Sequence, residues 1–215
     1  MKYTRAYKEI VKFLCVLGTI LSFASRDIES KVNRMDELLS SEEGKNYLFL
    51  DDMLKYELKA GITNADGIEQ VKSQKGKRYG TRIMFRLHQA MAFLVQFFIN
   101  VREQPHSKIH SIVNDAYKAT ISRNHSWLVR KTATIAFYAI PSRNTLIGRM
   151  GHDTSEQKLM DELKEIIDIT TDVYALIAKV FDKYSLVALN EPKTPTGNLK
   201  KSSSESAMTS KSKQV

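Results

Sequence analysis

The chain has 215 residues, with 33 Lys and Arg against 24 Asp and Glu and a formal net charge of +9. Its 42% hydrophobic content excludes a wholly disordered chain, and its single cysteine, Cys15, excludes an intramolecular disulfide framework and thiolate-only metal sites. Only 9 Gly and 4 Pro argue against a turn-rich all-β fold. The positive charge favours a polyanionic partner, either nucleic acid or a membrane, without choosing between them.

The N-terminal region has two interpretations. A basic segment, 1–12, precedes the uncharged residues 13–25 (FLCVLGTILSFAS), which are too few to span a bilayer. This pattern fits a signal peptide with a small-x-small cleavage site at Ser22-Phe23-Ala24. It fits equally well a buried helix of the domain. The pattern alone leaves both interpretations open.

The next segments alternate between helix and loop. Apolar residues recur at helical spacing in 26–40 and again in 46–60, which predicts two amphipathic helices. Residues 61–80 hold four glycines among polar residues and are predicted to form a loop. Residues 81–101 are apolar nearly all round, which is typical of a helix buried in a larger helical body.

The rest of the domain is also predicted to be helical. Helices are expected over 107–122, over 126–140 before Pro141, over 142–150, and over 155–186 with Asp153 or Thr154 as its cap. No segment alternates like a strand, so the fold class is all-α, with roughly seven helices. Residues 1–190 are expected to form the domain, and the Ser/Lys-rich residues 191–215 a disordered tail.

No catalytic or metal-binding motif is recognisable, so the polar residues on apolar segments become the candidates. Asp27 and Lys31 are four residues apart and share one helix face, as do Arg82 and Arg86. An Asp27–Lys31 pair could be purely structural. If these four groups converge, however, three cations meet one carboxylate, and the excess charge suits a phosphate, which arginine binds bidentately.

These residues carry a family resemblance. Residues 13–31, 81–98 and 125–146 (HSWLVRKTATIAFYAIPSRNTL) resemble, in order and separation, the glycolipid transfer protein family and within it the ceramide-1-phosphate transfer proteins. The resemblance covers about residues 3–187. It implies a two-layer all-α sandwich that holds one lipid, its chains between the layers and its headgroup at a surface cavity. Family members usually carry a helix before the stretch that begins here at Tyr3, so the first helix is expected to be missing.

The resemblance assigns a role to each polar candidate. Asp27 matches the aspartate that contacts the sphingoid amide N–H, and His125 matches the histidine that contacts the acyl amide carbonyl. Lys31, Arg82 and Arg86 match the phosphate-binding cations of the ceramide-1-phosphate members. The resemblance also implies a difference from the glycolipid-selective members. Those members have Asn at the position that matches Lys31 and Trp at the position that matches Arg86. The only tryptophan here, in the H-x-W-L-V-R stretch, is interpreted as a packing residue rather than a sugar platform.

Apolar residues on the matching stretches are candidates either for a lipid-chain pocket or for ordinary core. They are Phe23, Phe93, Leu94, Phe97, Val129, Ile135 and Phe137.

The resemblance implies non-vesicular transfer of a sphingolipid between membranes, most of all ceramide-1-phosphate. We therefore expect a monomer that contacts membranes transiently. We expect no enzyme activity, no cofactor and no nucleic-acid partner. Residues 13–25 match a helix of the domain, which favours an uncleaved, cytosolic chain. The alternatives are a lipid sensor or scaffold that binds the same lipid without efficient transfer, glycolipid transfer, or a basic helical nucleic-acid binder. The cations on largely apolar helices argue against the last of these.

Overall fold

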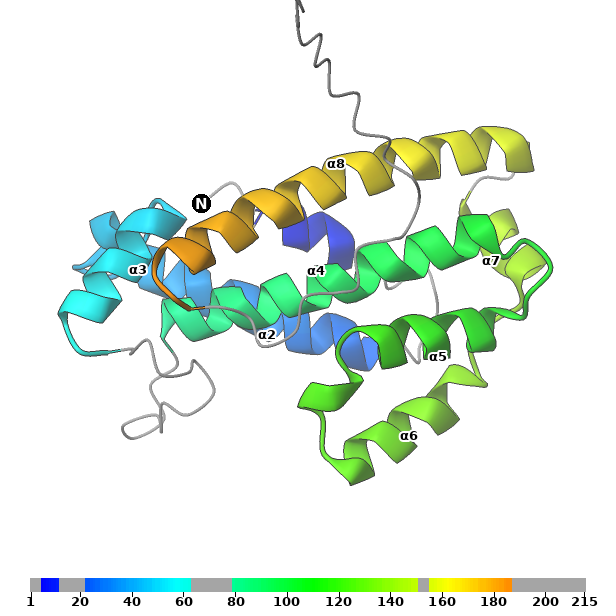
Figure 1. The fold of residues 1–215 in the computed structure, drawn as a ribbon, viewed down its shortest axis with the longest axis horizontal. Coiled ribbons are helices and arrows are strands. Elements are labelled where there is room, and N and C mark those ends of the chain that lie inside the picture. The colour runs from blue at the N-terminus through cyan, green and yellow to red at the C-terminus, as the bar shows by residue number, and fades with distance from the viewer. Residues whose placement is uncertain (1–4, 12–21, 63–78, 151–154, 187–215) are drawn as a thin grey trace, which may run out of the picture.

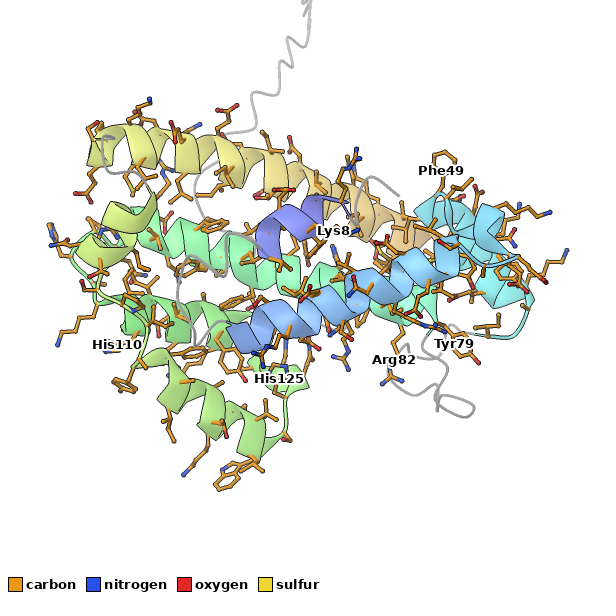
Figure 2. The ribbon with its side chains drawn as sticks, turned by 180° about the vertical axis from the view of Figure 1, so that it is seen from behind. Lys8, Phe49, Tyr79, Arg82, His110 and His125 are labelled. Atoms are coloured by element: carbon orange, nitrogen blue, oxygen red, sulfur yellow. The ribbon has the colours of Figure 1, made fainter. Side chains whose placement is uncertain are left out.

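The computed structural model describes residues 5–11, 22–62, 79–150 and 155–186, and every regular element among them is a helix. The predicted all-α class is therefore confirmed. Helix α4 (Gly80–Glu103) lies at the centre of the molecule, and α8 (Glu156–Lys183) runs along it (Figure 1). Helix α2 (Ser22–Leu39) and the helical residues 5–11 cover another face of α4 (Figure 2).

Helix α4 is central because its sequence is apolar on almost every side. Its fully buried side chains include Leu87, Met84 and Ile83, and apolar burial of this kind is the main stabilising term in folding. The N-terminal helical segment fastens onto it: the Tyr7 hydroxyl donates to the carbonyl oxygen of Leu87. The prediction of a buried helix over 81–101 is confirmed, with one residue more at its start and two at its end.

Helix α2 agrees with the predicted helix over 26–40 and extends it to Ser22. Ile28, Val32 and Met35 are buried at the predicted helical spacing. Residues 13–21 of the uncharged N-terminal stretch lie outside the described residues.

The helix predicted over 46–60 is confirmed in its later part, whereas its start differs. The chain forms a short 3-10 helix, η1 (Gly44–Tyr47), and then α3 (Leu50–Lys59). Phe49 separates them because its backbone is extended, with φ −121° and ψ 147°. After α3, Gly61 takes a left-handed φ of 65°, a conformation open to glycine because it lacks a Cβ. Most of the predicted 61–80 loop, residues 63–78, lies outside the described residues.

The C-terminal half of the chain packs a second group of helices around α4. Helix α5 (Ile109–Ala119) lies against α4, the 3-10 turn η3 (Ser122–Asn124) follows, and α6 (Trp127–Phe137) packs on α5 at the edge of the molecule (Figure 1). Helix α6 ends three residues before the predicted boundary, and α7 (Arg143–Met150) follows Pro141.

The predicted cap of the last helix is wrong. The cap is Ser155, whose hydroxyl accepts the backbone N–H of Lys158 at 3.3 Å. At the other end of α8, Lys183 Nζ bonds Asp51 Oδ1 of α3 at 2.6 Å and thereby ties the two helices together. The predicted tail, 191–215, lies outside the described residues.

Candidate headgroup site

Helix α2 presents the first two predicted site residues. Lys31 Nζ forms an ion pair with Asp27 Oδ2 one helical turn earlier, and it also bonds the backbone carbonyl of Asp27 at 3.4 Å. The two side chains differ in exposure: Lys31 is 16% exposed and Asp27 is 62% exposed. The pairing that the sequence left open therefore exists. The largely buried ammonium lies beside a carboxylate that solvent, or a ligand, can still reach.

Helix α4 carries the two arginines. Arg82 and Arg86 lie one turn apart on this otherwise apolar helix, and both side chains are partly buried. Arg86 Nη1 donates to Gln89 Oε1 at 3.1 Å, a neighbour that sequence reasoning missed. This hydrogen bond orients the guanidinium.

His125 follows η3, where the chain turns from α5 toward α6. Its Nδ1 lies 2.8 Å from the hydroxyl of Tyr117, and its backbone carbonyl accepts a hydrogen bond of 2.9 Å from Arg130 Nη1. With Tyr117 donating to Nδ1, the proton of the neutral ring is on Nε2, which is then a donor. Sequence reasoning missed both partners, because Tyr117 is eight residues away on another helix and no local pattern marks it.

Electrostatics connects His125 with the other predicted residues. Burial is the main cause that lowers the pKa of His125, and the positive charges of Arg86, Arg130 and Lys31 lower it further, while Asp27 acts in the opposite direction. Charges from α2, α4 and α6 therefore act on one imidazole. The charges of Asp27, Lys31 and Arg86 are thus close enough to His125 to influence its titration. Arg82 lies one turn before Arg86, and Figure 2 shows its side chain nearer the α3 end than that of His125.

The predicted lipid-chain residues fall into two groups. Leu94, Phe97 and Phe137 are buried, and Phe93 packs on the core with its ring stacked 6.4 Å from that of Phe97. Phe137 also contacts the site, because its ring meets the Tyr117 ring edge-on at 5.4 Å. Two of the others, Val129 and Ile135, lie on the outside of α6, 45% and 71% exposed, and the side chain of Phe23 lies outside the described residues.

The interpretation of Trp127 as a packing residue is wrong. Its side chain is 62% exposed, with the ammonium of Lys131 lying 4.9 Å from the ring centroid. Leu128 beside it is 67% exposed, and Phe137 is the only residue of α6 that is buried. Helix α6 therefore exposes apolar side chains together with a cation, since Lys131 lies between Trp127 and Ile135 at helical spacing. We call Trp127, Leu128, Val129 and Ile135 the α6 apolar face.

Within the described residues, no group of three or more His, Cys, Asp and Glu side chains is placed to hold a metal ion. The same ranges contain no helix that is long and apolar enough to cross a membrane.

The comparisons with known proteins agree with this geometry. A family model described as "Glycolipid transfer protein (GLTP)" matches residues 1–152 of the chain. The chain belongs to the glycolipid transfer protein family. Among curated members of this family, it is 33% identical over 188 residues to a ceramide-1-phosphate transfer protein of Xenopus laevis, an alignment that covers 87% of this chain and 85% of the relative.

Solved structures show the same fold. The human ceramide-1-phosphate transfer protein in complex with 12:0 ceramide-1-phosphate superimposes with a TM-score of 0.78 at 28% identity, covering 86% of this chain and 87% of the other. The mouse protein in its apo form superimposes with a TM-score of 0.75 at 30% identity, again covering 86% and 87%. The expected family and its helical sandwich are therefore confirmed.

Proposed function

We propose that this protein carries a sphingolipid between membranes and that its preferred lipid is ceramide-1-phosphate. The observation that supports the proposal is that the Asp27–Lys31 pair and the charge of Arg86 all act on the half-buried His125. Fully exposed to solvent, the positive charges of Lys31 and Arg86 could bind any anion. Here they lie on largely apolar helices, which suits an amphiphile with one phosphate and two alkyl chains.

Each site residue has a distinct task in this proposal. Lys31, Arg82 and Arg86 bind the phosphate oxygens, because ammonium and guanidinium groups form short, charge-assisted hydrogen bonds with them. Asp27, whose carboxylate is mostly exposed, accepts the sphingoid amide N–H. The Nε2–H of His125 donates to the acyl amide carbonyl, while Tyr117 holds the ring from the other side.

The alkyl chains take the apolar interior beside Phe97, Leu94 and Phe137. Transfer from one apolar medium to another recovers about 0.8 kcal/mol per CH₂ that would otherwise meet water, so the chains are carried at little net cost. The headgroup contacts then determine which lipid is selected. The cycle consists of docking, uptake, transport and release. It makes or breaks no bond, in keeping with a family of lipid carriers rather than enzymes.

The α6 apolar face supports transient contact with membranes. It exposes Trp127 and Leu128 next to Lys131 and Arg130, and this combination of an indole, an aliphatic group and cations suits the interface of an anionic bilayer. The face lies next to His125, so docking brings the headgroup site to the bilayer. We propose a monomeric carrier in the cytosol that meets membranes peripherally through this face.

Vesicle-to-vesicle transfer tests the proposal. Donor vesicles carry ceramide-1-phosphate or a neutral glycolipid with the same fluorescent acyl chain, and the two rates are compared. Ceramide-1-phosphate should move much faster, and equal rates would refute the selectivity. Tight binding with slow release would favour the lipid sensor or scaffold instead.

A pair of arginine variants makes the test specific to the site. Arg86→Leu should abolish most ceramide-1-phosphate transfer while the helical circular dichroism is unchanged, because the phosphate loses a guanidinium. Arg102→Leu is the matched control, since Arg102 is an exposed arginine in the last turn of the same helix. Retained transfer in Arg86→Leu would reject the role of Arg86. An equal loss in both variants would trace the effect to overall charge.

A further inference from the structure

A fully buried carboxylate lies at the start of the helix that carries both arginines. Glu57 of α3 is 0% exposed, yet it is outside the headgroup site described above. Its Oε1 accepts the backbone N–H of Gly80 at 2.7 Å, and its Oε2 accepts that of Thr81 at 2.9 Å. These are the first two residues of α4, whose N–H groups have no partner within the helix itself.

Tyr47, at the end of η1, is a close neighbour of the carboxylate. Burial above all, and then the negative charge of Glu57, raise the pKa of its hydroxyl. Tyr47 is itself buried. Two backbone donors on one buried carboxylate offset part of the cost of removing the charge from water, and the partial positive charge of a helix N-terminus offsets more.

Gly80 shows how closely these groups pack. A Cβ at this position would collide with Met53 Sδ and would lie 3.0 Å from Tyr47 Cε1 and 3.2 Å from Glu57 Oε1. A residue with a side chain would therefore displace at least one of these three side chains. The backbone carbonyl of Glu57 also accepts the N–H of Ile62 at 2.9 Å, so one residue fixes both the chain leaving α3 and the chain entering α4.

The clamped turn leads directly into the headgroup site. Arg82 is the residue after Thr81, and Arg86 lies one turn further along the same rigid helix. Without the carboxylate, two buried N–H groups would lose their partners, at about 1–3 kcal/mol each, and the first turn would have to shift or fray to reach water. A guanidinium that binds phosphate bidentately loses much of its advantage when its backbone moves by an ångström.

We propose that Glu57 is a positioning residue for phosphate recognition: it clamps the first turn of α4 so that Arg82 and Arg86 meet the phosphate in a fixed arrangement. The proposal rests on the proposed function, since it assumes a phosphate-bearing lipid at these arginines. It assigns to Glu57 no contact with the lipid itself.

The test compares two lipids that differ only in the phosphate. Short-chain ceramide-1-phosphate and ceramide with the same fluorescent acyl chain are titrated into the full-length protein. Glu57→Gln keeps the shape but leaves one acceptor for two N–H donors. It should weaken ceramide-1-phosphate binding about ten-fold, equivalent to about 1.4 kcal/mol, while ceramide binding changes little. Amide hydrogen exchange in the peptide spanning 79–86 should rise in this variant.

Asp51→Asn is the matched control. Asp51 is a carboxylate at the opposite end of α3, and it binds Lys183 of α8 and the hydroxyl of the following Tyr184 rather than α4. This variant should loosen the α3–α8 contact and leave the ratio of the two lipid affinities unchanged. Tyr47→Phe removes only the hydroxyl near the buried carboxylate, so it gives an intermediate loss and tests the clamp even if Glu57→Gln folds poorly.

The outcomes separate this proposal from the proposed function. The clamp variants are Glu57→Gln and Tyr47→Phe. If the wild-type protein discriminates between the two lipids and both clamp variants keep that discrimination, the positioning role of Glu57 is wrong and the proposed function stands. If the clamp variants lose affinity for both lipids equally, Glu57 is structural only, which also refutes the proposal. If the wild-type protein does not prefer the phosphorylated lipid, the proposed function fails and the proposal falls with it.

Discussion

His88 should make the stability of this protein depend on pH in a defined window. The imidazole is 1% exposed, between α4 and α8, where its ring stacks on Tyr174 with centroids 4.0 Å apart and lies 5.7 Å from the ring of Phe181. Its Nδ1 is buried without a hydrogen-bond partner. Burial therefore disfavours the charged ring and lowers the pKa of His88 from 6.5 to about 4.

The direction and size of the effect follow from these two pKa values. Between pH 6.5 and about 4 the unfolded chain binds a proton at His88 and the folded protein does not, so the free energy of unfolding falls as pH falls. The contribution is fully present above pH 6.5 and fully lost below about pH 4. At about 1.4 kcal/mol per pKa unit, this amounts to about 3 kcal/mol, of which about 2 kcal/mol is lost by pH 5.

The variant His88→Phe isolates this contribution. Phenylalanine keeps a ring against Tyr174 and cannot titrate, so the variant should lose less stability than the wild type on acidification. Urea unfolding followed by circular dichroism at pH 7 and pH 5 measures the difference. His125, with a pKa also lowered by burial, remains in both proteins and cancels in the comparison, and Asp51, whose pKa is lowered below 3.8, contributes only at more acidic pH. If both proteins lose stability in parallel between pH 7 and pH 5, the reasoning about His88 is wrong.

Three further variants test other contacts. Tyr117→Phe leaves the His125 ring without its hydroxyl partner and should weaken ceramide-1-phosphate binding about five-fold, equivalent to about 1 kcal/mol, in the fluorescence titration; unchanged affinity would count against a fixed tautomer. Leu87→Ala empties a 0%-exposed position on α4 and should lower the free energy of unfolding by about 2–5 kcal/mol in urea, so a loss below 1 kcal/mol would mean that the core refills the space. Ser155→Ala removes the cap of α8 and should cost about 1 kcal/mol in thermal unfolding, whereas no change would show that solvent replaces the hydroxyl.

The helices could be predicted largely because their apolar periodicity is also what buries them. The buried positions of α2 and the all-round apolar α4 were readable from spacing alone. Interruptions and boundaries of the helices were harder to predict from the sequence, because they depend on the backbone conformation of single residues. The extended Phe49 interrupts a pattern that looks continuous in sequence, and Ser155 caps α8 where two earlier residues had equally good capping side chains.

The site shows a different limit. Asp27, Lys31 and Arg86 were identified as candidates, but their approach to His125 depends on packing between α2, α4 and the turn after η3. Tyr117 and Glu57 were missed for the same reason, because each acts on a residue of another element. A buried glutamate within an amphipathic helix has no sequence signature that separates it from a solvated one.

Helix α6 explains why apolar pattern alone could not divide pocket from surface. Residues Val129, Ile135 and Phe137 all lie in one apolar stretch, yet Phe137 is 7% exposed whereas Ile135 is 71% exposed. Side chains that meet a protein interior and side chains that meet a bilayer interface need the same apolar chemistry, so hydropathy assigns them alike. What distinguishes them is the neighbours that folding supplies: Phe137 meets Tyr117 of α5, whereas Trp127 has Lys131 above its ring. A carrier must hold both kinds of surface near one headgroup site, so the exposure of α6 is itself an argument for membrane docking there.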